Sequence, residues 1–374
     1  MNAIKDYLKS NKIYVITFIA LLIIGIGAII FTYNDYFLYQ KTIVKTIDIK
    51  EEYLSTETIN YGYHDELYMQ TITAKILNGE HKGEIVTIEN EYHKGEAYDQ
   101  KYHKGDELIV SLNERDDEIV NTHIENYKRD KYIVILTVML VLTIYIVGRI
   151  KGLMSIVSVI LNISIFVILV GINAKGVSLP FLSFIGAVIF SILCLMLVSG
   201  PNQKTLAAIL SSIVGVSITL LISYVVIKLT KYQGVRFEQL DLLTRPYEGI
   251  FISEIILGGL GAIMDISITM ASSLNELIDK DNRITIKALT KSGIEIGKDV
   301  MSTMINVLFF TYICSSLTNL AIYFRNGIQI NLLMSQYISL EMTRALTGAI
   351  GIVITIPISI AISLLLYKRR LIKW

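Results

Sequence analysis

The sequence has little charge and almost no cysteine. Charged residues make up 18% of its 374 residues, the formal net charge is +1, and 53% of the residues are hydrophobic. This balance excludes a nucleic-acid-binding protein and an ordinary soluble enzyme. The two cysteines, Cys194 and Cys314, both lie in apolar runs, so no disulfide framework supports a soluble domain.

Long apolar runs are abundant by contrast. A helix needs about 17 residues or more to cross a hydrocarbon core of roughly 30 Å. The runs of this length predict an all-α polytopic membrane protein with eight transmembrane helices. The predicted spans are 13–31, 132–148, 153–172, 179–199, 205–228, 249–274, 299–324 and 341–367.

The distribution of lysine and arginine predicts the orientation of these spans. If the N-terminus is cytoplasmic, the basic clusters at 149–151, 280–298 and 368–370 all lie inside, as the positive-inside rule requires. Segment 229–247 is an exception, because three basic residues lie on its predicted outer side, although acidic residues offset them. The first span lacks a small-x-small cleavage site and is expected to remain as an anchor. Both termini are therefore predicted in the cytoplasm.

The spans divide the chain into five predicted parts. Residues 1–32 are the cytoplasmic N-terminus and anchor helix, and 33–130 form an extracytoplasmic domain between helices 1 and 2. Residues 131–228 supply scaffold helices 2–5, and 229–248 form an outer linker. Residues 249–374 hold helices 6–8 and a cytoplasmic tail. This last part carries nearly all the charge within the spans, so function is sought there.

The extracytoplasmic segment is predicted to be a small β barrel or sandwich. Its β-prone runs, 68–77, 84–89 and 107–112, alternate with glycine turns. Three His-Lys-Gly turns place His81, His93 and His103 in similar settings, and imidazole is a ligand for transition metals. Glycine after lysine is also ordinary turn chemistry, so solvated turns are favoured over a metal site. No cofactor is assigned.

The stretch from Glu254 to Glu276 is the most informative in the chain. Glu254, Asp265 and Glu276 are spaced eleven residues apart, so successive carboxylates turn by only about 20° around a helix. A carboxylate at mid-membrane depth costs several kcal/mol, which favours a functional role for Asp265. The alternative is an aspartate that neighbouring polar groups satisfy and that serves assembly. Small or polar residues predicted to pack on this face include Gly258, Gly261 and Ser272.

Helices 7 and 8 carry polar residues that reach matching depths. At 1.5 Å per residue, Glu254 lies near the outer boundary with the start of helix 8, while Asp265 lies at a level that Asn306 can reach. A ladder of carboxylates of this kind suits a proton or cation path. Arg344 is the expected counter-ion of Glu254 or Glu341. The predicted pathway residues are Glu254, Asp265, Asn275, Glu276, Asp299, Asn306, Glu341 and Arg344, and the predicted packing positions of helix 8 are Gly348, Gly351 and Pro357.

Several stretches resemble the YibE/F-like family of bacterial multi-pass membrane proteins. They are 259–265 with 271–277, 296–301 with Asn306, 341–351 with Ile356-Pro357, and the outer segment 74–83. Val307 departs from the small polar residue expected after the asparagine, which puts any role of that position in doubt. The resemblance implies a bacterial plasma membrane and supports the predicted topology and sites. It implies no particular substrate.

Two functions remain open at this point. The first is a transporter or channel for a small solute or ion, with its path between helices 6–8 and Asp265 at its centre. The second is a membrane scaffold or sensor whose outer domain binds a ligand or partner. An intramembrane enzyme is disfavoured, because the sequence has no His-Glu-x-x-His run and its two candidate aspartates lie at different depths. The expected partners are the lipid bilayer and a solute or ion, with a homo-oligomer left open and nucleic acid excluded.

Overall fold

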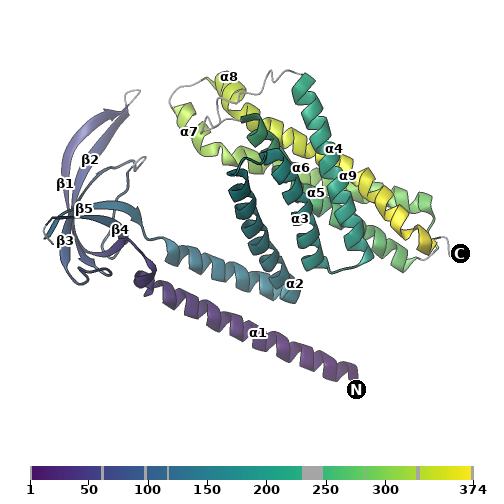
Figure 1. Cartoon of the computed structure of the whole chain (residues 1–374), viewed down its shortest axis with the longest axis horizontal. Coiled ribbons are helices and arrows are strands. Elements are labelled where there is room, and N and C mark those ends of the chain that lie inside the picture. Colours follow the sequence, from purple (N-terminus) through teal and green to yellow (C-terminus); the bar gives the residue numbers. More distant parts are fainter. Residues whose placement is uncertain are drawn as a thin grey trace. The chain divides into compact units, whose positions relative to one another are not determined.

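The computed structural model describes residues 2–59, 63–96, 99–115, 118–229, 247–281, 283–325 and 329–371. The chain forms two compact units, Met1–Arg149 and Ile150–Trp374. Figure 1 shows a β sheet with two helices in the first unit and a bundle of helices in the second. The outer linker predicted at 229–248 lies almost wholly outside the described residues.

The first unit contains α1 (Asn2–Thr32) and the first part of α2 (Asp130–Asn173), which pack side by side. The ring of Tyr14 stacks on that of Tyr145 with centroids 5.3 Å apart, and the guanidinium of Arg149 lies 4.9 Å from the Tyr14 centroid. At Arg149 the backbone of α2 leaves helical geometry, with φ 49° and ψ −132°. The predicted spans 132–148 and 153–172 thus lie on either side of a break.

Five strands between these helices form one antiparallel sheet of order β3-β2-β1-β4-β5, preceded by the short 3-10 helix η1 (Asp35–Leu38). The two edge strands, β3 and β5, also approach each other, so the sheet curls around a core. Buried side chains such as Val44, Ile72, Ile88 and Leu108 fill that core. The strands are β1 (Thr42–Ile59), β2 (Tyr63–Ile76), β3 (Ile85–His93), β4 (Glu107–Arg115) and β5 (Glu118–Tyr127).

The turns of this sheet use glycine as the sequence predicts. Gly79, Gly83 and Gly105 have φ angles of +81°, +101° and +92°, which an L residue with a Cβ rarely adopts. Each lies in an expected Asn-Gly or His-Lys-Gly turn. The prediction of a barrel or sandwich is confirmed only as far as a small antiparallel sheet.

The second unit is a helical bundle in which α5 and α9 are central. Its helices are the second part of α2, then α3 (Leu179–Ser199), α4 (Gln203–Leu229), α5 (Tyr247–Lys280), α6 (Ile286–Ser315), α7 (Leu317–Arg325), α8 (Ile330–Leu333), the π-helix η4 (Met334–Ile338) and α9 (Ser339–Leu371). Glycines let these helices approach closely. A Cβ at Gly215 would lie 2.5 Å from Thr355 Oγ1, and one at Gly351 would lie 2.7 Å from Thr219 Oγ1. These two contacts tie α4 to α9.

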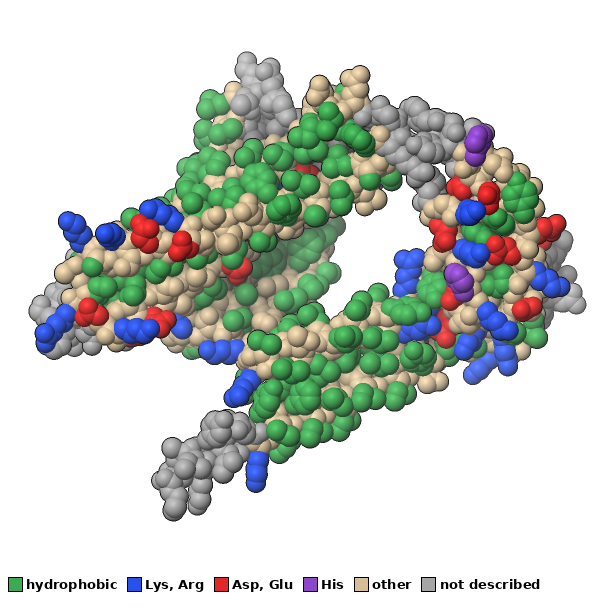
Figure 2. All heavy atoms as spheres, turned by 180° about the vertical axis from the view of Figure 1, so that it is seen from behind, with side chains coloured by type: hydrophobic (Ala, Val, Ile, Leu, Met, Phe, Trp, Pro, Cys, Tyr) green, Lys and Arg blue, Asp and Glu red, His purple; other side chains and the backbone are tan. Residues whose placement is uncertain are grey.

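Six of the described helices are long and apolar enough to cross a membrane, namely α1, α2, α3, α4, α5 and α9. The pair α6 and α7, bent by 53° at its break, would be a seventh. The predicted number of eight is not confirmed, because α2 counts once among these helices although two of the predicted spans lie on either side of its break at Arg149. In Figure 2 hydrophobic side chains cover the helices, whereas charged side chains gather over the sheet and near helix ends. The chain is a multi-pass membrane protein.

Candidate functional site

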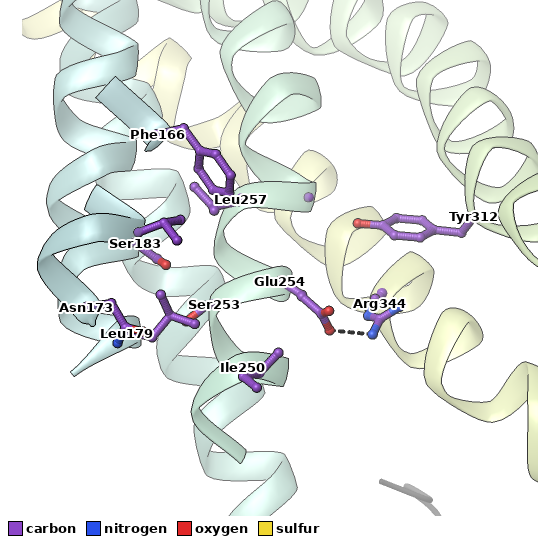
Figure 3. Close-up of a pocket in the computed structure, with 12 residues that line it drawn as sticks. Phe166, Asn173, Leu179, Ser183, Ile250, Ser253, Glu254, Leu257, Tyr312 and Arg344 are labelled. Carbon is purple, nitrogen blue, oxygen red and sulfur yellow. Dashed lines mark hydrogen bonds and ion pairs between the residues drawn. The ribbon is translucent and has the colours of Figure 1, made fainter. Parts of the chain in front are cut away.

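An ion triad joins the N-terminal parts of α5 and α9. The Arg344 guanidinium donates through one terminal nitrogen to Glu341 Oε1 at 2.6 Å and through the other to Glu254 Oε2. Arg344 is therefore the counter-ion of both predicted carboxylates (Figure 3). Its guanidinium carbon also lies 5.6 Å from the centre of the Phe251 ring. The Arg344 side chain is 11% exposed, so the cation of the triad is largely buried.

A cavity of about 430 Å³ opens beside this triad. It lies where α2 and α6 end and where α3, α5 and α9 begin, so five helices meet around it. Figure 3 shows Glu254 and Arg344 facing each other on one side of α5, with Phe166, Ser183 and Leu257 on the other side. Its walls are mostly apolar, and the charged groups among them are Glu254 and Arg344.

Tyr312 of α6 sets the spacing between α5 and α6 at this cavity. Its hydroxyl points at α5 (Figure 3), where a Cβ added to Gly258 would overlap it. The face of α5 that carries Gly258 therefore faces α6. Asp265 lies seven residues further along, about 20° away around the helix, on the same face. Gly261, between them, has open space where its side chain would be.

Asp265 lies at mid-length of α5 and its side chain is exposed. Helix α5 carries six charged residues, and five of them take part in a hydrogen bond, ion pair or electrostatic interaction: Glu248, Glu254, Glu276, Asp279 and Lys280. Within the described part of the chain, no such interaction is recorded for the carboxylate of Asp265. The face of α5 is thus closed by Tyr312 near Gly258 and open at Asp265.

The expected pairing of Asp265 with Asn306 stays a prediction. The side chain of Asn306 is exposed, and the described residues show no hydrogen bond between the two. Six residues separate Asn306 from Tyr312, which turns it roughly 120° away from the position that faces α5.

The predicted inner group does not come together as one cluster. Glu276 pairs with Lys280 at 2.8 Å along the surface of α5, and Asn275 donates to Asp279 at 2.8 Å. Asp299 is exposed on α6. Asn275 and Glu276 lie near the end of α5 away from the ion triad, and Asp299 lies near the middle of α6; none of the three lines the cavity.

The predicted packing positions differ in their surroundings. Gly348 of α9 packs against Leu308 of α6, where an added Cβ would lie 2.7 Å from a methyl group of the leucine. Gly351 packs against α4, and Ser272 is half-buried. Pro357 lies inside α9 with its ring exposed, and the helix continues through it.

The three histidines of the His-Lys-Gly turns each lie close to a carboxylate. His81 Nδ1 lies 3.1 Å from Glu84, His93 Nδ1 lies 2.5 Å from Asp99, and His103 Nδ1 lies 3.9 Å from Asp106. The hydrogen bond to Asp99 raises the pKa of His93, and a contact with Glu57 adds to this shift. No group of three or more potential metal ligands occurs among the described residues.

Sequence reasoning missed the cavity and its aromatic walls. Phe166 and Tyr312 lie in apolar runs, where an aromatic residue carries no special signal. Tyr312 has a polar tip within a span, which is the one sequence feature that marks it. The α2 and α3 side of the cavity, including Asn173 and Ser183, had been placed among the scaffold helices.

Comparisons with known proteins agree over most of the chain. A family model described as YibE/F-like protein matches residues 136–369, and one described as YibE/F family N-terminal domain matches residues 37–127. No curated protein and no solved structure matches the chain. The two matched regions correspond to the helices from α2 onward and to the five-stranded sheet with the end of the short helix before it.

Proposed function

This chain belongs to the YibE/F-like family, and we propose that it is a transporter or channel for a small solute or ion. The path runs along the face of α5 that is turned toward α6, with α9 at its outer entrance. Asp265 is the central binding residue on this path. The plasma membrane and an extracytoplasmic β sheet, with both termini inside, complete the proposal.

The observation that supports this proposal is the isolation of Asp265. A carboxylate in the middle of a membrane-spanning helix costs several kcal/mol and normally faces protein or a water-filled cavity rather than lipid. Open space next to Gly261 on the same face gives a permeating species room to approach the carboxylate. The other charged side chains of α5 have interaction partners and lie nearer its ends, with Glu254 paired to Arg344 and Glu276 paired to Lys280.

The test is ion flux through Asp265→Asn. This substitution keeps the shape and hydrogen bonding of the side chain and removes its titratable charge. We expect the variant to insert and fold like the parent, but to lose proton flux in proteoliposomes that contain a pH-sensitive dye under a potassium diffusion potential. A sodium-sensitive dye in parallel vesicles tests the same site for a metal cation.

Glu276→Gln is the matched control, because it also removes one carboxylate from α5. Glu276 is exposed and paired with Lys280, so the loss of its charge leaves the proposed path intact. Equal flux in the parent and in Asp265→Asn, together with unfolding of Asp265→Leu, would identify the carboxylate as structural and rule out the transport proposal.

A membrane sensor or scaffold is the second proposal, and one feature of the sheet favours it. The hairpin of β1 and β2 extends to the pair Ile59 and Tyr63, while the pairing of β2 with β3 stops at Leu67. Large apolar side chains are exposed at the base of this arm, with Tyr53 at 52% and Leu54 at 43% exposed. Replacing both by serine should abolish capture of a partner by the intact protein and leave ion flux unchanged. If partner capture is unchanged in this double variant and ion flux is lost, the sensor proposal is refuted and the transport proposal remains.

A further inference from the structure

The cavity beside the ion triad has the size of a ligand site. Its volume of about 430 Å³ falls within the range of roughly 300–1,000 Å³ typical of pockets that hold small molecules. It opens at the end of the second unit where α5 and α9 begin and α6 ends. A solute that enters from this end would meet the cavity before it reached the level of Asp265.

The charge next to the cavity is negative. Glu254 and Glu341 each carry one negative charge and share a single Arg344, so the triad has a net charge of −1. Arg344 uses both terminal nitrogens on these carboxylates. Glu254 is the most accessible member, with its side chain 38% exposed, against 17% for Glu341 and 11% for Arg344. An incoming ligand therefore meets a carboxylate that is only partly neutralised.

The rest of the cavity wall is apolar and partly aromatic. Val170, Leu179 and Leu257 line it together with the ring of Phe166. The Tyr312 ring lies across from α5 near the triad (Figure 3). Aromatic faces attract cations that have lost part of their hydration, and apolar walls favour a ligand with hydrocarbon groups.

From this combination we infer that the cavity binds a monovalent organic cation with an apolar body, such as a substituted ammonium. Glu254 is the counter-ion of the bound cation, and the apolar walls hold its hydrocarbon part. The inference deepens the proposed function by naming the chemical class of the solute. The inference rests on the transport proposal for the movement of the cation across the membrane. The binding of the cation to the cavity does not depend on that proposal.

Two other ligand classes fit the cavity less well. An anion would have to compete with two carboxylates for Arg344 and would meet net negative charge. A calcium or magnesium ion prefers about six oxygen ligands, and the charged groups lining this cavity provide only one carboxylate together with an arginine. The organic cation uses both the charge and the apolar walls.

The experiment measures binding to the full chain in detergent micelles by calorimetry. The probes are benzyltrimethylammonium, its neutral isostere neopentylbenzene, and the anion phenylacetate. We expect saturable binding of the ammonium alone. In Glu254→Gln its affinity should fall at least tenfold, while Arg344 keeps Glu341 as a partner.

Two further variants test the site independently and serve as a control. Val170→Trp fills the cavity from an exposed position and leaves the triad unchanged, so it should also weaken binding at least tenfold, and it decides the question if Glu254→Gln does not fold. Glu276→Gln removes a distant carboxylate and should bind like the parent.

The outcomes separate this inference from the transport proposal. Equal affinity of the ammonium for the parent and for Val170→Trp, or phenylacetate binding as tight as ammonium binding, would overturn the cation site. Binding that survives in Asp265→Asn while flux is lost supports both proposals. Flux without ammonium binding would refute the cation site alone, and binding without flux in any vesicle assay would refute transport alone.

Discussion

Replacement of Lys128 by methionine should destabilise the junction between the five-stranded sheet and the helices α1 and α2. The Lys128 side chain is fully buried, and its ammonium lies 2.8 Å from Asp35 and 2.8 Å from Asp130. It also donates to the carbonyl oxygen of Thr32 at 2.9 Å, and Glu107 lies 3.9 Å away. One ammonium thus serves the end of α1, the start of α2 and strand β4.

The expected loss of stability follows from the carboxylates that the substitution leaves without a counter-ion. Methionine keeps most of the hydrocarbon stem, so little packing is lost. Three carboxylates then share the site without their cation. Removal of one partner from a buried ion pair costs about 3–5 kcal/mol, which corresponds to roughly a 100-fold to 5,000-fold change in an opening equilibrium.

Hydrogen exchange of the strand amides in the intact protein measures this change. The amides of β1 and β4 should exchange at least about 100-fold faster in Lys128→Met than in the parent. Lys94→Met is the matched control, because Lys94 pairs with Glu66 at 3.0 Å and its side chain is 66% exposed. An exposed pair contributes at most about 1 kcal/mol. Equal protection in both variants would refute the reasoning.

The pH dependence gives an independent check on the cause. Burial raises the pKa of Asp35 above its usual value even with Lys128 nearby. Without the ammonium, the folded-state pKa of this carboxyl rises further. A carboxyl group whose pKa is higher in the folded state than in the unfolded state lowers the free energy of unfolding at pH values above its unfolded-state pKa. This loss of stability shrinks as the pH falls through the folded-state pKa. The difference between variant and parent should therefore shrink at acid pH.

Three further predictions concern the pH response, the packing and the topology. His93 has a raised pKa, so its contribution is present below about pH 6.5 and is lost as the pH rises through its folded value; His93→Gln should lower the melting temperature more at about pH 5.5 than at about pH 8.5. Gly351→Leu should unfold the bundle or lower its melting temperature by several degrees, because the new side chain overlaps Thr219, and an unchanged melting curve would contradict this packing. In a cysteine-free background, Lys82→Cys should label from outside intact cells and Lys287→Cys only after permeabilisation; the opposite pattern would reverse the topology.

Much of the five-stranded sheet could be predicted because its signals are local. Alternating runs and glycine turns predict β2, β3 and β4, and the positive φ angles of Gly79 and Gly105 show why glycine occurs there. Strand β5 was missed, and so was β1. Its residues 47–57 are largely exposed and rich in charge, so they lack the alternation that marks a strand with one buried face.

The site was predictable only in part, because helix periodicity shows which residues share a face and not which face another helix covers. The spacing of eleven residues placed Glu254 and Asp265 together, and the matching depth placed Arg344 near Glu254. The turn of α6 that presents Tyr312 to Gly258 depends on close packing between helices. That contact, and the cavity next to it, required the tertiary structure.

Some charged side chains of this protein pair with fixed partners and stabilise the fold, whereas the carboxylate on the proposed path has no such partner among the described residues. Lys128 and Arg344 each compensate more than one carboxylate, and each joins segments that are far apart in the sequence. A charge that is fully neutralised by fixed partners has little affinity left for a mobile ion, whereas the triad of Glu254, Glu341 and Arg344 keeps a net charge of −1. Asp265 lies on an open face of α5, and its charge is uncompensated within the described residues. In a low dielectric such a charge attracts a cation or takes up a proton, so the path is proposed where fixed neutralisation is missing.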